Sequence, residues 1–182
     1  MKKILSITML LAFTIAVYAQ QEKEVTQFLG IPVDGNKTEM IKKLQAKGFQ
    51  RTEIFDLEGE FNGRDVYIGI GTNNNKVYRI AVRDKNEYNE TDIKIRFNNL
   101  CFQFANNPKY ISLQDYIIPE SENIGYEMTV NKKRYEAAYY QRPLTSDYDK
   151  RSVWFMIGEV SYEYNIFLFY DNKYNRANGE EL

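Results

Sequence analysis

The sequence contains no histidine, and this absence removes more chemistry than any other feature of its composition. Without an imidazole the chain cannot form a Ser-His-Asp triad, a Cys-His pair, a histidine-ligated metal site or a histidine pH switch. Lysine and arginine together number 24 against 25 aspartates and glutamates, so the chain lacks the basic excess of nucleic-acid-binding domains. We therefore expect no nucleic-acid partner.

Cysteine is nearly absent as well, because Cys101 is the only one and cannot form a disulfide within the chain. It lies on the apolar stripe of a predicted helix, where a thiol packs as a small hydrophobe, and no histidine is present to activate it. Asp147 and Asp149 lack the glycine and the trailing glutamate of a calcium loop. We expect no catalytic residue, no metal and no cofactor.

Long apolar runs are missing except at the start of the chain. Lys2 and Lys3 precede the apolar stretch 4–16, and the small-residue pattern VYA ends at Ala19. This is the layout of a secretory signal peptide, and the apolar run is too short to span a membrane. We expect cleavage after Ala19, which would leave residues 20–182 in the periplasm or outside the cell with no membrane span.

What the sequence does contain is enough apolar material for a packed core. Apolar residues make up 43% of the chain and aromatics 15%, with 15 tyrosines and 11 phenylalanines. Chains of this composition fold rather than stay disordered, and the length suits one domain. We expect residues 20–182 to form a single domain.

Two segments have the periodicity and the end signals of helices. The first begins after Asn36, a good N-cap residue, and ends before Gly48, where a left-handed C-cap is expected. The second begins after Asn89. Their apolar stripes are Met40, Ile41 and Leu44 in the first, and Ile93, Phe97, Leu100, Cys101 and Phe104 in the second.

Alternation of apolar and polar residues predicts strands after each helix. The first group forms a three-stranded meander with turns at Asn62-Gly63 and Asn73–Asn75, and its strands are 57–61, 66–70 and 78–82. After a long connection over 106–123, the second group contains a hairpin that turns at Asn131-Lys132. Its strands are 126–130, 135–139, 153–158 and 162–170.

Helix followed by meander, twice over, indicates an α+β fold with antiparallel strands and two helices. Two arrangements fit this order equally well. The chain could form two helix-plus-meander units in tandem, over 28–84 and 89–172, or one larger sheet backed by two helices.

Glu58 and Glu60 are the best-placed pair of carboxylates. They lie two apart on a predicted strand, so both side chains point to one face about 7 Å apart. That separation suits two carboxylates that flank a water in glycoside inversion. A solvated strand face requires the same alternation, and we prefer that simpler interpretation.

The surplus of aromatic residues in the last third of the chain is the other feature that needs a function. Tyrosine and tryptophan offer an apolar plate with a polar tip, which suits protein interfaces and sugar stacking. Most of these rings belong to the core. The candidate binding residues are Tyr135, Tyr139, Trp154, Tyr162 and Tyr164.

Several stretches together resemble a family of exported proteins from Bacteroidetes-type bacteria. They are the signal peptide, FLGIPVDGNKTEMIKKLQAKGF, EFNGRDVYIGIGTNNNKVYRIAV, DIKIRFNNLCFQF, YEMTVNKKRYEAAYYQ and the closing YDNKYNRANGEEL. The resemblance spans essentially the whole mature chain and implies a secreted or periplasmic setting. That family has no assigned activity, so the resemblance implies no site residue, cofactor or partner.

The expectation that follows is a non-catalytic exported module that binds another protein. The alternative is a protein that binds or acts on carbohydrate, either through an aromatic platform or through Glu58 and Glu60. A structural component of the envelope is a third possibility.

Overall fold

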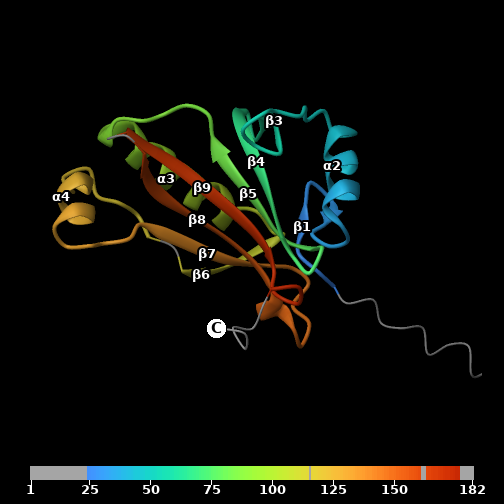
Figure 1. Cartoon of the computed structure of the whole chain (residues 1–182). Helices are drawn as coiled ribbons and strands as arrows, with labels where there is room; N and C mark the ends of the chain where they lie inside the picture. Colours follow the sequence, from blue (N-terminus) through green and yellow to red (C-terminus); the bar gives the residue numbers. More distant parts are fainter. Residues whose placement is uncertain (1–23, 115, 161–162, 177–182) are drawn as a thin grey trace, which may run out of the picture.

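The computed structural model describes residues 24–114, 116–160 and 163–176, and they form an α+β fold with antiparallel strands, as predicted. Seven strands make one sheet in the order β3-β4-β5-β9-β8-β7-β6 (Figure 1). A small hairpin lies beside it. The strands are β1 (Gln27–Phe28), β2 (Ile31–Pro32), β3 (Leu57–Phe61), β4 (Arg64–Asn73), β5 (Lys76–Asp84), β6 (Tyr110–Gln114), β7 (Glu136–Gln141), β8 (Arg151–Val160) and β9 (Glu163–Asn172).

The sheet consists of two meanders joined edge to edge. Strands β3, β4 and β5 follow helix α2 (Lys37–Gln45), and strands β6 to β9 follow helix α3 (Glu90–Ala105). The two meanders meet where β5 pairs with β9, over Arg79–Arg83 and Phe167–Asp171. Each half of the chain therefore has the predicted helix-then-meander order, and both halves share one continuous sheet.

Both predicted helices form, and their N-caps are those that the sequence indicates. The Asn36 side chain accepts a hydrogen bond from the Glu39 amide at 2.9 Å, and the Asn89 side chain accepts one from the Asp92 amide at 2.9 Å. Helix α2 itself ends at Gln45 with Ala46 as a right-handed C-cap, and the left-handed residue Gly48, with a φ of +101°, follows two positions later. Every apolar residue of the two predicted stripes is buried, including Cys101.

The asparagine-rich turns of the first meander also form as predicted. Asn62 and Gly63 have φ values of +53° and +70°, and Asn74 and Asn75 have +46° and +62°. Two consecutive positive φ angles define the turn type whose twist suits antiparallel strands. These turns fix the register of β3 with β4 and of β4 with β5.

The predicted strand over 126–130 is wrong, because this segment forms the helix α4 (Ile124–Thr129). Asn123 precedes it and accepts a hydrogen bond from the Tyr126 amide at 2.8 Å. Capping by Asn123 thus outweighs the alternating pattern of residues 126–130, whose Tyr126 and Val130 are exposed. Strand β7 pairs with β6 and β8 instead, and β6 lies in the predicted connection.

Helix α3 packs against one face of the sheet, behind β8 and β9 in Figure 1. The Phe97 ring contacts the Phe155 ring edge-on, with their centroids 5.1 Å apart. The buried core extends from this face to α2 and the β1–β2 hairpin. No helix among the described residues is long and apolar enough to cross a membrane.

Candidate functional site

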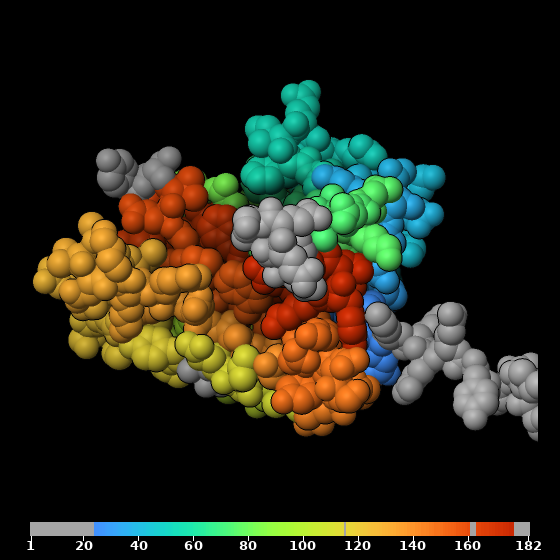
Figure 2. Space-filling view, turned by 60° about the horizontal axis from the view of Figure 1, so that its bottom comes forward, coloured from blue at the N-terminus to red at the C-terminus, as the bar shows by residue number. Residues whose placement is uncertain are grey.

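The sheet face opposite α3 is the main candidate for a binding surface. Its side chains alternate with the buried ones along each strand, and they are half-buried. We call this surface the open face. Its central residues are Tyr67, Gly69, Gly71, Arg79, Ala81, Arg83, Ala138, Tyr140, Trp154, Met156, Phe167 and Phe169. Figure 2 shows residues of β8 and β9, in orange to red, at the surface near the centre of the molecule.

The composition of the open face departs from that of an ordinary solvated sheet. An antiparallel sheet with one face in water usually carries polar side chains on that face. Here β8 and β9 present Trp154, Met156, Phe167 and Phe169, which are apolar and half-exposed. Apolar side chains that stay partly accessible on a sheet face make this face a candidate interaction surface.

Register brings two of these rings together. Trp154 lies directly opposite Phe169 on the neighbouring strand, and their rings stack with centroids 4.3 Å apart. The same row continues through Ala81 on one side and Ala138 on the other. Small side chains therefore flank the stacked aromatic pair along this row.

An ion pair holds the indole of Trp154 in place. The Asp171 carboxylate accepts hydrogen bonds from Arg79 Nε at 2.6 Å, from Arg79 Nη2 at 2.7 Å and from Trp154 Nε1 at 3.0 Å. These bonds to Asp171 raise the pKa of Arg79 above its ordinary value. The guanidinium carbon also lies 4.7 Å from the centroid of the Phe169 ring. The network fixes the aromatic pair from the side.

Two strand glycines let aromatic rings approach the backbone closely. A Cβ atom on Gly158 would lie 2.6 Å from the ring of Phe167, and one on Gly71 would lie 3.1 Å from the ring of Tyr78. Any larger residue at these positions would push the rings outward. Strand glycines often mark such close approach.

Of the five aromatic candidates from the sequence, the structure places one on the open face. Trp154 lies at its centre, whereas Tyr135 and Tyr139 are buried in the core. Tyr164 is half-buried and packs against the core side, and Tyr162 lies outside the described residues. Tyr135 and Tyr139 therefore do not contribute to a binding surface in this conformation.

The carboxylate pair lies where alternation predicts it. Glu58 and Glu60 are on the open-face side of β3, which is an edge strand. Lys85 Nζ is 2.8 Å from Glu58 Oε2 and 5.0 Å from the centroid of the Tyr67 ring. Glu58 is thus occupied by an ion pair and Glu60 is exposed, an arrangement typical of a solvated rim.

Sequence reasoning missed Arg79, Asp171, Phe167 and Phe169. The continuous apolar run of β9 indicates a central strand, which is correct, but it does not show that one side of the strand faces solvent. Arg79 and Asp171 are 92 positions apart, so only the pairing of β5 with β9 reveals their contact.

A second polar cluster lies away from the open face, beside α4. The Glu122 carboxylate accepts hydrogen bonds from Tyr135, Lys133 and, at 2.9 Å, from Tyr116. Burial alone would raise the pKa of Glu122, but the bonds from these three donors outweigh burial and lower it. The cluster ties the segment before α4 to the start of β7.

Among residues 24–114, 116–160 and 163–176, no three Asp, Glu or Cys side chains come together in a way that could hold a metal ion. The comparisons with known proteins found no matching family model, no matching curated protein and no matching solved structure.

Proposed function

We propose that this protein is an exported, non-catalytic binding module that docks another protein onto its open face, in the periplasm or outside the cell. The observation that carries the proposal is the half-exposed aromatic surface on β8 and β9, centred on Trp154 and Phe169. Export is supported by the N-terminal sequence and by the resemblance to exported proteins.

The residue types on this surface favour a protein partner. Protein interfaces are enriched in tyrosine, tryptophan, phenylalanine, methionine and arginine. The open face contains all five, and its arginines are already engaged. Arg79 binds Asp171, and Arg83 Nε lies 3.3 Å from Asn165 Oδ1. A surface with rings held in place and charges paired loses little conformational freedom when a partner binds.

Carbohydrate is the second candidate, and the aromatic rings beside Gly71 and Gly158 favour it. Aromatic ring faces stack on the apolar faces of sugars. A protein partner and a carbohydrate ligand would both bind the open face, so variants of this face tested against both kinds of ligand can distinguish the two proposals.

The test uses Ala138→Arg, which places a long charged side chain next to Trp154 without touching the core. Ala105→Arg, at the exposed end of α3, is the matched control. Tagged protein is incubated with envelope and culture fractions, captured proteins are identified by mass spectrometry, and the affinity of each is then measured with purified components. We expect one saturable partner whose affinity falls at least tenfold with Ala138→Arg.

The control variant should bind that partner as the wild type does. Equal binding by both variants would show that the open face is not the docking surface. Binding to a glycan array that Ala138→Arg abolishes, with no protein partner, would replace the proposal by the carbohydrate alternative.

A further inference from the structure

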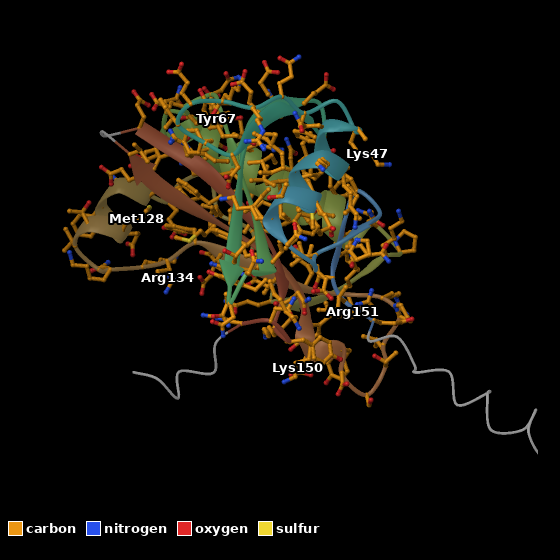
Figure 3. The ribbon with its side chains drawn as sticks, turned by 45° about the vertical axis from the view of Figure 1, so that its right-hand side comes forward. Lys47, Tyr67, Met128, Arg134, Lys150 and Arg151 are labelled. Carbon is orange, nitrogen blue, oxygen red and sulfur yellow. The ribbon has the colours of Figure 1, made fainter. Side chains whose placement is uncertain are left out.

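A large cavity lies at the end of the sheet near the β1–β2 hairpin, away from the centre of the open face. Its volume is about 1100 Å³. The hairpin, the end of β7 and the start of β6 and β8 form its walls. Its charged lining residues are Glu24, Asp34, Lys109, Arg142 and Arg151, after the last of which we name it the Arg151 cavity. Figure 3 shows Arg151 beside the N-terminal segment, far from Tyr67 and Lys47.

Arg151 is a buried cation whose hydrogen bonds are incomplete. Its side chain is 3% exposed. Nη1 donates to Glu24 Oε2 and to the Pro143 carbonyl, both at 3.1 Å, and Nη2 donates to the Arg142 carbonyl at 2.9 Å. Nε is buried and has no partner among the described residues. Burial lowers the pKa of Arg151, as expected for a desolvated cation.

Two other arginines of this protein show which group usually accepts the hydrogen bond from an arginine Nε. Arg79 places Nε and Nη2 on the two oxygens of Asp171, at 2.6 and 2.7 Å. Arg96 does the same with Asp84, at 2.8 and 3.2 Å. The planar guanidinium fork fits an oxyanion in this way. In Arg151 the Nε side of the fork is unfilled.

The charges around the cavity leave an excess of cations. Asp34 accepts hydrogen bonds from the Gly35 amide and from Asn175 Nδ2, both at 2.7 Å, and Glu24 is engaged by Arg151. Lys109 and Arg142 are exposed, and the part of the chain that the structure describes offers their side chains no hydrogen bond or ion pair. The lining therefore has three cations against two carboxylates, and the side chains of Lys109 and Arg142 have no partner among the described residues.

Glu24 already demonstrates that a carboxylate fits against Arg151. It comes from the N-terminal segment, and its side chain is 47% exposed, so little packing holds it there. A ligand oxyanion that takes the place of Glu24 would accept a hydrogen bond from Nη1 of the buried guanidinium. It would also lie near the unpaired cations Lys109 and Arg142.

We propose that the Arg151 cavity binds a small multivalent oxyanion, with Arg151 holding one carboxylate or phosphate group in place of Glu24 and with Lys109 and Arg142 neutralising the remaining charge. The cavity is larger than a single phosphate requires, and part of its wall is apolar, which accommodates a carbon skeleton. The apolar lining residues are Val25, Leu29, Pro32, Tyr110 and Pro143. This site is independent of the binding proposed for the open face.

Isothermal titration of the purified protein with citrate and with inorganic phosphate tests the proposal, and sodium chloride at equal ionic strength serves as the control for screening. We expect saturable binding of at least one of the two anions. Lys109→Ala and Arg142→Ala should each weaken it about fivefold, because each removes one exposed charge contact. Glu24→Gln should strengthen it several-fold, since the competing carboxylate is lost.

Lys47→Ala is the matched control, because Lys47 is an exposed lysine at a distance from the cavity. Citrate binding without phosphate binding identifies carboxylate as the ligand group, and the reverse identifies phosphate. The absence of saturable binding of either anion overturns the proposal. So does an affinity that Lys109→Ala and Arg142→Ala leave unchanged. Neither variant lies on the open face, so failure here is separate from failure of the proposed function.

Discussion

Arg79 and Asp171 face each other across the junction of β5 and β9, and both carboxylate oxygens of Asp171 accept from the guanidinium, at 2.6 and 2.7 Å. The pair joins the two meanders and also supports the ring pair of the open face through Trp154 Nε1. One contact thus serves both the fold and the candidate binding surface. Breaking the Arg79–Asp171 ion pair should therefore lower both the stability of the fold and the affinity of the open face for its partner.

Asp171→Asn should destabilise the protein by about 3 kcal/mol, because it leaves the Arg79 charge half-buried without its counter-charge. Chemical denaturation followed by tryptophan fluorescence measures this directly, since Trp154 is the only tryptophan. Asp65→Asn is the control on the exposed end of β4 and should change stability by less than about 0.5 kcal/mol. Equal stability of the two variants would contradict a structural role for the pair.

Gly158→Ala should displace the Phe167 ring from the sheet, because the new Cβ would lie 2.6 Å from a ring atom. We expect a loss of about 1 kcal/mol from this overpacking. Gly69→Ala is a matched control on the same face, where the nearest atom is the Ala81 Cβ at 3.9 Å. That change should be neutral or stabilising, by up to about 1 kcal/mol. The same sign for both variants would argue against a close contact of the Phe167 ring with Gly158.

The Glu122 cluster predicts a pH dependence of stability. The pKa of Glu122 is lowered below its ordinary value of 4.5 in the folded protein. Its contribution is therefore complete above about pH 5 and is lost as pH falls through the lowered value. Glu122→Gln should reduce the free energy of unfolding at pH 7, and its difference from the wild type should shrink toward pH 3. Glu120→Gln, at an exposed carboxylate, should show no such convergence.

Asn123→Ala should loosen α4. It removes the acceptor for the Tyr126 amide and should cost about 1 kcal/mol of helix stability. Hydrogen exchange of the Tyr126 and Glu127 amides should accelerate in the variant. The amides of β8 should exchange as slowly as they do in the wild type. Ser121→Ala, just before the helix, provides the control. Unchanged exchange at Tyr126 would mean that this cap does not hold the helix.

The features that the sequence predicts correctly are those that depend on neighbouring residues. Asn36 and Asn89 mark helix starts by capping, and Asn62-Gly63 marks a turn by its backbone preference. Residues 126–130 fail because alternation and helical capping compete within six residues, and the capping residue Asn123 lies outside the alternating run. The sequence predicts the secondary structure of a segment correctly only when its capping residues and its apolar pattern indicate the same structure.

The candidate surface depends on information that a strand pattern does not contain. Alternation shows that Phe167 and Phe169 share a side of β9, but it cannot say which side α3 covers. Tyr139 and Trp154 look alike as aromatic strand residues, yet the first is in the core and the second on the open face. Which ring is accessible follows from the placement of a helix about 50 residues away.

The position of β9 has a consequence for the order of folding. It is the last described strand along the chain, yet it lies in the middle of the sheet, between β5 and β8. The earlier meander of β3, β4 and β5 therefore keeps an unpaired inner edge until residues 163–172 are available. Such long-range closure slows folding, because a large loop must be ordered before its contacts form. The protein should acquire its stable tertiary structure late, in a single step that joins the two halves and completes the open face at the same moment.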